Sequence, residues 1–456
     1  MNASASHTPA SNRATNGASA ATAAKTMVGP PSNSPLAKKF RDPRLDFFRG
    51  IAMFIIFIAH TPRDWWALWI PARFGFSDAT EIFVFCSGMA SALAFGAVFE
   101  KRGWWMGLAR IAHRIWQVYW AHIGLFFAVL LLVTVFDQIG TLHGERFTGS
   151  YVGALNLKHF YTKTADLIPG LFTLTYVPNY FDILPMYLVI LAMIPVVMGL
   201  ARIHLGLVAA FVISVWMLAN LQLLGLSPIN FPAEPWSGRA WFFNPFGWQL
   251  VFFTGFAFMR GWLPQPPVTK GLVIFAIIVL LITIPFAYFR ILRAVPELKE
   301  IATLLKPFTG KTSFGLFRYL HFLALAYVAW VAVGPMGSRL THWGRFEIIM
   351  HIIQKVGQQS LAVFVSSLVV AQVVGMIFRV YGTSWPIATL GNLGGFAALI
   401  AVAYLVAWFK GQPWRATATR PPQLARDTGS NTQSTDGRGV PAASALPAGS
   451  LARPSQ

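Results

Sequence analysis

The sequence predicts an all-α polytopic membrane protein with about ten transmembrane helices. Of its 456 residues, 55% are hydrophobic, 15% are aromatic and only 11% are charged. A water-soluble domain of this length would carry about twice that charged fraction. Apolar stretches also recur along the chain, and most of them reach the ~20 residues that a helix needs to cross a bilayer. We therefore expect lipid to solvate much of the folded chain.

The predicted spans follow one another between two polar tails. They lie near residues 45–61, 78–99, 112–136, 182–201, 205–225, 245–263, 271–290, 315–334, 358–378 and 386–409. Hydropathy supports the first span least, because it is short and carries charged residues. A further apolar segment, Leu167 to Val177, is too short and too interrupted by proline to span a bilayer. We interpret it as an interfacial or re-entrant part of the long loop 137–181.

Both ends of the chain have the composition of disordered tails. Residues 1–40 are rich in Ala, Ser, Thr and Asn, and they lack the apolar middle of a signal peptide. Residues 411–456 are rich in Pro, Ser, Ala and Gly. The predicted organisation is therefore an N-terminal tail, a transmembrane domain over residues 41–410 and a C-terminal tail.

The net charge of +20 reflects membrane topology rather than a binding surface. The basic residues lie between apolar runs and form no compact patch, so we expect no nucleic-acid partner. With ten spans, both tails share one side with most of the basic residues, among them Arg44, Lys101 and Arg202. The loops on the opposite side hold fewer Lys and Arg residues, and these are balanced by nearly as many Asp and Glu residues. The positive-inside rule therefore predicts cytoplasmic tails and an extracytoplasmic loop 137–181.

The single cysteine and the histidines give no sign of a disulfide or a metal centre. Cys86 lies inside an apolar run, and we interpret it as a small buried hydrophobe rather than a nucleophile. The ten histidines are scattered, and the chain has neither a metal-ligand spacing nor a Gly-rich phosphate loop. We expect no metal and no bound cofactor.

The first span carries the most informative pair of ionisable residues, Arg49 and His60. They are eleven positions apart, which returns within about 20° of the same helix face at a rise of about 16 Å. Asp46 lies on that face too. Ionisable groups inside a span are costly and usually face a polar cavity. The alternative is that Arg49 reaches the lipid headgroups and His60 caps the outer end of the helix.

Two acidic residues begin the second span, on the same outer side as His60. Asp78 can cap the helix, and Glu81 sits one turn inside it, where a carboxylate can orient or charge the imidazole. The alternative is that both carboxylates only favour the positive end of the helix dipole. Further along the span, Ser87 and Gly88 form a small patch suited to close helix packing.

Basic residues mark the cytoplasmic start of the third span. Arg110 and Arg114 are four positions apart on one face, and such a pair can bind phosphates. The alternative is a plain positive-inside loop.

A further polar group is predicted at the outer ends of other spans. Arg318 and His321 are three positions apart and share a face, and Asp182 directly precedes another span. With His60, Asp78 and Glu81, these residues are candidates to line one outward-facing pocket.

These motifs together resemble acyltransferase family 3. Residues 45–50 followed by His60 resemble its Arg-to-His signature, and residues 83–88 resemble its Phe-Phe-x-x-Ser-Gly run, with Cys86 where a larger apolar residue is usual. Arg110 and Arg114 resemble its basic start to the third span. Residues 357–361 resemble its late Gly-x-x-Ser-aromatic segment, with Leu361 in place of the aromatic residue.

Finer details resemble one branch, the OpgC family of osmoregulated periplasmic glucan succinyltransferases. They lie in residues 41–50, 75–88, 182–187 and 318–322, and the resemblance covers about residues 40 to 410. It implies a ten-helix fold in a bacterial inner membrane, a cytoplasmic acyl-CoA donor and an extracytoplasmic glycan acceptor. Ala59 and Met89 are small departures that leave the motifs intact.

We therefore expect an O-acyltransferase that moves an acyl group onto hydroxyls of a periplasmic glucan or another glycan. Succinyl-CoA or acetyl-CoA would be the donor substrate, and the glucan-synthesis machinery would be a further partner. We expect Arg49, Arg110 and Arg114 to bind the donor, His60 to act as general base and Glu81 to orient His60. The candidates for the acceptor side are Asp78, Asp182, Arg318 and His321, and the last two could instead stabilise the oxyanion. An acyl intermediate on His60 is the alternative to its role as a base.

Three alternatives remain open at this point. The first is an O-acetyltransferase of a surface polysaccharide. The second is a polysaccharide or lipid transporter, which would show inverted repeats, and none is evident in the sequence. The third is a structural membrane protein, which would not need Arg49 and His60 on one face of a span.

Overall fold

The computed structural model describes residues 42–142, 151–341 and 346–415. The chain divides into two compact units, residues 1–410 and 411–456. Only residues 411–415 of the second unit are described, so most of both predicted tails lies outside the described residues. Within the described ranges the regular secondary structure is helical, and one isolated bridge joins Pro232 to Ala240.

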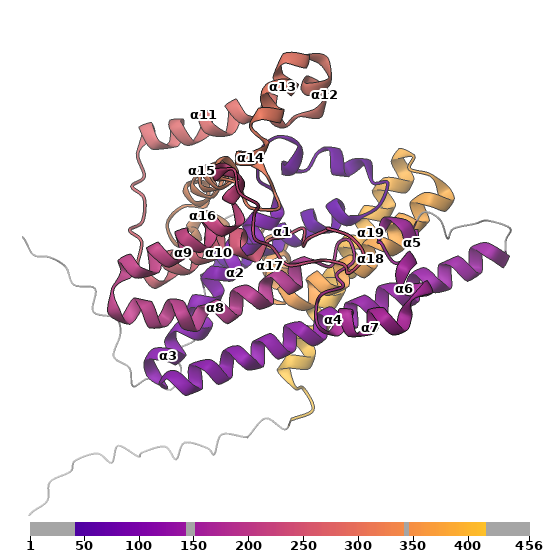
Figure 1. The fold of residues 1–456 in the computed structure, drawn as a ribbon, viewed down its shortest axis with the longest axis horizontal. Helices are drawn as coiled ribbons and strands as arrows, with labels where there is room; N and C mark the ends of the chain where they lie inside the picture. The colour runs from indigo at the N-terminus through magenta and orange to yellow at the C-terminus, as the bar shows by residue number, and fades with distance from the viewer. Residues whose placement is uncertain (1–41, 143–150, 342–345, 416–456) are drawn as a thin grey trace, which may run out of the picture. The chain divides into compact units, whose positions relative to one another are not determined.

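A helix occupies each of the ten predicted spans (Figure 1). The second of them runs from Ala79 to Lys101 through one π-helical turn, η3. The others, in chain order, are α1 (Pro43–His60), α4 (Trp104–Leu142), α8 (Ile183–Ile203), α9 (Leu205–Ala219), α10 (Pro245–Arg260), α11 (Lys270–Ala287), α15 (Leu316–Val333), α18 (Ser360–Tyr381) and α19 (Trp385–Gly411), and the second itself is built from α2 (Ala79–Ser91), η3 (Ala92–Gly96) and α3 (Ala97–Lys101).

Seven of these helices are long and apolar enough to cross a membrane by length and composition. They are α2 to α3, α4, α8, α11, α15, α18 and α19. Helix α9 is apolar but has only 15 residues, α10 has 16, and α1 carries Arg44, Asp46 and Arg49 within its 18 residues. The all-helical membrane fold is therefore confirmed, while the count of ten spans and their orientation stay predictions.

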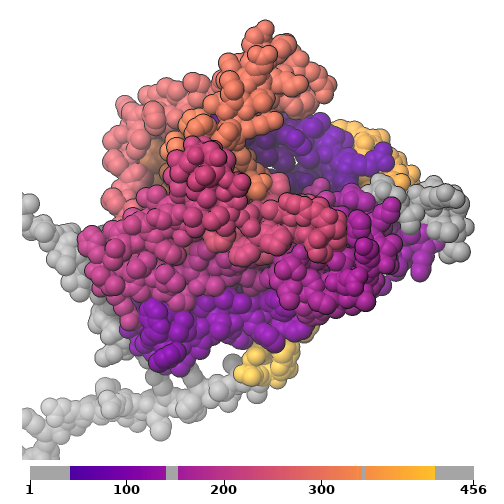
Figure 2. Space-filling view, in the orientation of Figure 1, coloured from indigo at the N-terminus to yellow at the C-terminus, as the bar shows by residue number. Residues whose placement is uncertain are grey.

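Short helices connect the spans, and hydropathy gave little sign of them. The segment interpreted as interfacial or re-entrant contains α7 (Thr164–Phe172), in which Leu167 and Leu171 are buried while Ile168 and Phe172 are exposed. Figure 2 shows α12 and α13 extending at the top of the view, in orange. The connecting helices are η1 (Trp65–Leu68), η2 (Pro71–Arg73), α5 (Tyr151–Ala154), α6 (Lys158–Thr162), η4 (Leu221–Leu224), α12 (Phe289–Ala294), α13 (Pro296–Leu304), α14 (Lys306–Thr309), η5 (Pro335–Gly337), α16 (Ser338–Thr341) and α17 (Glu347–Gln358).

Two helix crossings are so close that only glycine fits at them. At the crossing of α2 and α10, a Cβ on Gly88 would lie 1.9 Å from the carbonyl oxygen of Phe252, and a Cβ on Gly255 would lie 2.3 Å from that of Phe85. Any side chain there would displace a backbone. The expectation that Gly88 supports close helix packing is thus confirmed, and Cys86 is buried on the same helix.

Helix α1 crosses α17 in the same way. A Cβ on Gly50 would lie 2.0 Å from the carbonyl oxygen of Ile353, and one on Gly357 would lie 1.8 Å from that of Asp46. Because α18 follows α17 directly, this crossing places Arg49 beside the first residue of α18.

Helix α4 is the longest element and has two different faces. It packs against α8 and α18, and its residues Val118, His122 and Phe126 are wholly buried. Trp116 and Trp120 lie on its exposed side. Its 39 residues correspond to about 58 Å, roughly twice the ~30 Å hydrocarbon thickness of a bilayer. Helix α4 is therefore longer than a bilayer crossing requires.

Candidate functional site

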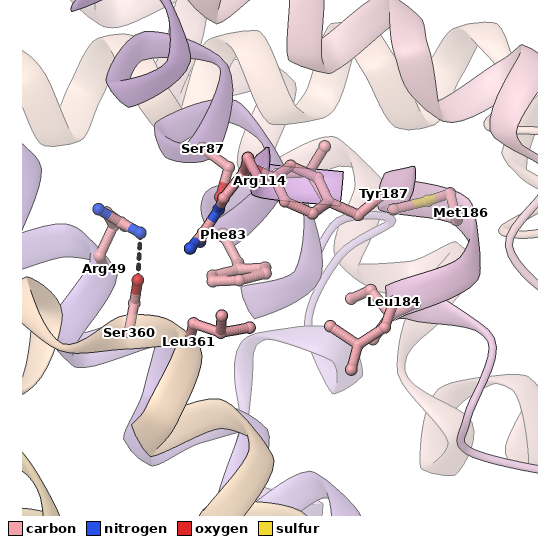
Figure 3. Close-up of a pocket in the computed structure, with 11 residues that line it drawn as sticks. Arg49, Phe83, Ser87, Arg114, Leu184, Met186, Tyr187, Ser360 and Leu361 are labelled. Atoms are coloured by element: carbon pink, nitrogen blue, oxygen red, sulfur yellow. Dashed lines mark hydrogen bonds between the residues drawn. The ribbon is translucent and has the colours of Figure 1, made fainter. Parts of the chain in front are cut away.

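Five helices line one small pocket, with a cavity volume of about 20 Å³, that contains two guanidinium groups (Figure 3). Arg49 of α1 and Arg114 of α4 turn these groups toward the same space. None of the residues that line this arginine pocket is acidic, so the pocket favours an anion. The remaining lining residues are Phe83, Val84, Ser87, Ile183, Leu184, Met186, Tyr187, Ser360 and Leu361.

Ser360 holds Arg49 at the edge of the arginine pocket. The Nη2 of Arg49 donates a hydrogen bond to Ser360 Oγ, and Ser360 is buried. Ser360 is also the first residue of α18, whose start has no side-chain cap. In the sequence analysis Ser360 appears only as part of a family segment, because a serine at a helix start has many structural uses.

The structure separates the two arginines that the sequence paired. Arg114 lines the arginine pocket and donates a hydrogen bond of 3.3 Å from Nη1 to Gln117. Arg110 is exposed and is not among the pocket residues. Spacing within one helix could not show this difference, because the cation that faces Arg114 comes from α1.

His60 is the last residue of α1, about 16 Å along the helix from Arg49. Its Nδ1 lies 2.8 Å from the carbonyl oxygen of Ile56. Because a carbonyl oxygen can only accept, Nδ1 carries the hydrogen and Nε2 of the neutral ring keeps a lone pair. The ring also meets Tyr180 edge to face, with 5.5 Å between the ring centroids.

Glu81 and Asp78 form the capping box at the start of α2. Glu81 is fully buried, and its Oε2 accepts the backbone N–H of Asp78 at 2.8 Å. Its Oε1 lies 2.8 Å from Nη1 of Arg318. Both oxygens of Glu81 thus have partners other than His60. The expected contact of Glu81 with His60 is therefore not formed, and Glu81 instead makes a direct ion pair with Arg318.

Lys311 adds a second ion pair beside the first. Its Nζ binds the Oδ2 of Asp78. Burial alone would raise the pKa of the Asp78 carboxyl, but Lys311, Glu81 and Arg318 outweigh it and hold that pKa below its usual range. Asp78 is therefore ionised at neutral pH. Sequence reasoning missed Lys311, because a single lysine in a polar loop has no spacing signal.

His321 closes the same region from α15. It is buried, its Nδ1 lies 2.7 Å from Ser77 Oγ, and it accepts the backbone N–H of Ser77 at 3.3 Å. Gly75 packs so closely that a Cβ there would lie 2.3 Å from Nε2 of His321. His321 therefore holds the turn that leads into α2.

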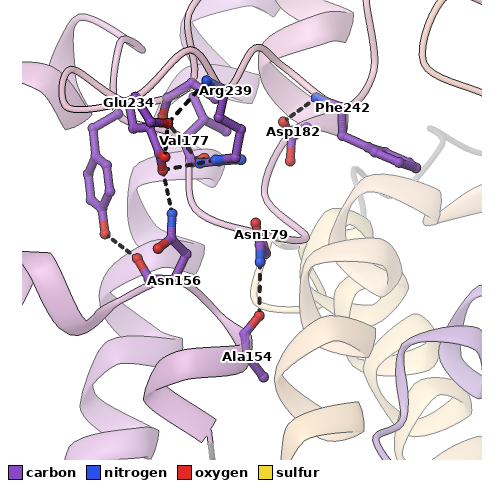
Figure 4. A network of polar contacts seen from close by, with 11 residues as sticks. Ala154, Asn156, Val177, Asn179, Asp182, Glu234, Arg239 and Phe242 are labelled. Carbon is purple, nitrogen blue, oxygen red and sulfur yellow. Dashed lines mark hydrogen bonds and ion pairs between the residues drawn. The ribbon is translucent and has the colours of Figure 1, made fainter.

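Asp182 belongs to a separate polar network that precedes α8 (Figure 4). Its Oδ1 accepts the backbone N–H of Phe242 at 2.8 Å, and burial raises its pKa to about 6. In the same network, Nη2 of Arg239 donates to the carbonyl oxygen of Val177 at 2.6 Å, and its Nε lies 2.9 Å from Glu234. This network fixes both ends of the turn between residues 177 and 182.

The fixed turn holds Tyr180 against His60 in a strained conformation. Tyr180 has φ 73°, in the left-handed region that costs a residue with a Cβ of order 1–3 kcal/mol. Its neighbour Asn179 donates to the carbonyl oxygen of Ala154 at 3.1 Å. The anchored turn thus presents an aromatic ring, 52% exposed, beside the imidazole.

Across the described ranges, no three His, Cys, Asp or Glu side chains come close enough to hold a metal ion.

Comparison with known proteins identifies a family. The model of a family described as OpgC protein matches residues 41–411, which is most of the chain. No match is found among curated proteins or among solved structures.

Proposed function

The chain belongs to the OpgC protein family, and from this membership and the arginine pocket we propose that it is a membrane acyltransferase acting on a glucan. The observation that carries the proposal is that two guanidinium groups lie in one pocket without a carboxylate. One of them belongs to Arg49 of α1, and the same helix ends at His60. An anionic donor and a base for a hydroxyl acceptor are the two components that such a reaction needs.

The donor would be an acyl-CoA that enters from the cytoplasm. Arg49 and Arg114 would bind its phosphates, or the terminal carboxylate of the acyl group. A bidentate guanidinium is a natural partner for a carboxylate, and this favours a dicarboxylic acyl group such as succinyl over acetyl. Ser360 would keep Arg49 in position through their hydrogen bond.

His60 would act as the general base of the transfer. Its Nε2 would take the proton of a sugar hydroxyl while that oxygen forms a bond to the thioester carbonyl carbon. The carbon–sulfur bond would then break, and the leaving thiolate would take the proton from the imidazolium. The products are an O-acyl ester and free CoA, so atoms and charge balance.

The polar group at the start of α2 would shape the acceptor side. Arg318 and His321 already bind Glu81 and Ser77, so their contacts favour positioning over direct chemistry. In the same way, Glu81 would act on His60 by fixing the start of α2 rather than by a direct hydrogen bond. The ion pair of Asp78 and Lys311 presents charged groups that a sugar hydroxyl can bind.

Mass analysis of periplasmic glucans tests this proposal. Glucans from cells with and without the chain would be compared, and the mass lost per substituent would identify the acyl group as succinyl or acetyl. Glucans of identical mass in the two strains would contradict the proposal. A change in glucan amount without a change in substituents would instead favour a transporter.

A further inference from the structure

Tyr180 is a strained, half-exposed tyrosine to which the proposed reaction gives no role. Its φ of 73° lies in the left-handed region, which glycine adopts freely and a residue with a Cβ does not. Tyr180 is 52% exposed, and its hydroxyl has no hydrogen-bond partner among the described residues. Glycine would suit the backbone better here, so the presence of this side chain needs an explanation other than folding.

Hydrogen bonds on both sides of Tyr180 fix its position (Figure 4). Asn179 donates to the carbonyl oxygens of residues 154–155, from its side chain at 3.1 Å and from its backbone N–H at 3.2 Å. On the other side, Asp182 accepts the backbone N–H of Phe242 at 2.8 Å. Strained residues persist only where the surrounding structure holds them, and they cluster at functional sites. The ring of Tyr180 is therefore held in place before any ligand arrives.

This ring lies against an imidazole that a ligand can approach. His60 is half-buried, and its Nδ1 is engaged by the carbonyl oxygen of Ile56. Its Nε2 has no partner in the described part of the chain, and it is not among the buried unpartnered atoms there. The rings of His60 and Tyr180 meet at 72°. Such an edge-to-face contact covers at most one face of the tyrosine ring, so the other face stays open beside His60.

A charged pair lies near the same imidazole. Asp78 and Lys311 form an ion pair, and both of their charges act on His60. The Nζ of Lys311 also lies 5.6 Å from the centre of the Phe243 ring, and the residue before Phe243 donates its backbone N–H to Asp182. The charged pair is thus connected to the turn that carries the tyrosine. An open aromatic face and charged hydrogen-bonding groups accompany one base.

We propose that Tyr180 is the binding platform for a sugar ring of the glucan acceptor, an inference that rests on the proposed function. A sugar ring has a face of C–H groups and a rim of hydroxyls. The negative face of an aromatic ring attracts the C–H groups, and charged side chains bind the hydroxyls. A sugar stacked on Tyr180 presents a hydroxyl to Nε2 of His60. A tyrosine that only anchored the chain among lipid headgroups would need neither the strained backbone nor the contact with His60.

Initial rates of glucan modification by the purified protein test this role. The substrate is glucan isolated from cells that lack the chain, and the donor is the acyl-CoA that the parent uses. Tyr180→Ala should raise the KM for glucan about tenfold and leave the KM for the donor unchanged. Its kcat should fall less than the glucan KM rises, because His60 is intact. Tyr180→Phe keeps the ring and loses only a hydroxyl without a partner, so it should keep the parental KM.

Tyr180→Gly separates ligand binding from backbone strain. Glycine adopts the left-handed conformation freely, so this variant should melt no lower than Tyr180→Ala. Its glucan KM should nevertheless rise as much, because the ring is gone. Tyr161→Ala is the matched control, since Tyr161 is 44% exposed in the same predicted loop and its hydroxyl lies 2.9 Å from that of Thr134. This control should keep the parental glucan KM.

A parental glucan KM in both Tyr180→Ala and Tyr180→Gly would overturn the inference, and if Tyr180→Ala does not fold, Tyr180→Gly alone decides. An equal rise in Tyr161→Ala would also overturn it, because exposed tyrosines of this loop would then act in a general way. The same holds for a donor KM that rises with the glucan KM. A parent that modifies glucan with neither succinyl-CoA nor acetyl-CoA would overturn the proposed function, and with it this inference.

Discussion

One hydrogen bond decides which atom of His60 can accept a proton. Since Nδ1 donates to the carbonyl oxygen of Ile56, the lone pair is on Nε2. The sequence predicted His60 and Arg49 as a pair because a straight helix fixes their relative direction. It could not predict the tautomer or the neighbouring Tyr180, because the turn before α8 brings that ring to His60 from far along the chain.

Replacing His60 should remove most of the activity without removing the protein. General-base catalysis is typically worth about 10² to 10⁴ in rate, so His60→Gln should retain less than roughly a tenth of parental glucan modification. His60→Ala should abolish detectable modification, while immunoblotting of membranes shows parental amounts of both variants. Substantial activity in His60→Gln would assign the residue a positioning or capping role.

Arg114 and Arg110 give a matched pair for testing the donor site. Arg114→Ala should weaken CoA binding by about tenfold or more, because a charge-assisted hydrogen bond to a phosphate is lost. Arg110→Ala should change it little, because Arg110 is exposed outside the arginine pocket. Calorimetry on both purified variants makes the comparison. If Arg114→Ala binds CoA as tightly as Arg110→Ala and the parent do, both arginines serve only to set the membrane topology.

Hydropathy located the long helices, because a bilayer-spanning helix needs a long apolar run. It did not locate α17, which is amphipathic and carries Glu347, His351 and Lys355. Helices α12 to α14 were also missed, since each is shorter than ten residues. The polar loop from α14 to α15 then supplies Lys311, so part of the candidate site was missed with these elements.

The crossing of α2 and α10 should tolerate no added methyl group. In Gly255→Ala the new Cβ would approach the carbonyl oxygen of Phe85, and such overpacking typically costs about 1–3 kcal/mol. The variant should therefore melt several degrees lower in detergent. Gly124→Ala on α4 is the control, because nothing lies within 4 Å of its added Cβ. It should melt at the parental temperature or slightly above, since alanine favours a helix. Equal melting of both variants would mean that the two helices are not in close contact.

On the scale of the whole molecule, the orientation in the membrane rests on charge alone. Ten spans and the positive-inside rule place both tails in the cytoplasm. After Arg415, we expect activity from a fused reporter that works only in the cytoplasm and none from one that works only in the periplasm. In loop 137–181, we expect the opposite result from the two reporters. A periplasmic signal from the fusion after Arg415 would contradict the ten-span arrangement.

The two glycine crossings have a consequence for how the molecule could work. Gly50 with Gly357, and Gly88 with Gly255, each join two helices backbone to backbone. The backbones touch directly at these crossings. Helix α1 therefore cannot tilt relative to α17, nor α2 relative to α10, without breaking the contact. The walls on either side of the arginine pocket then behave as a fixed frame. For the acyl transfer proposed above, such a frame means that the acyl group would move past fixed helices, unlike the substrate of a carrier whose helices alternate between two openings.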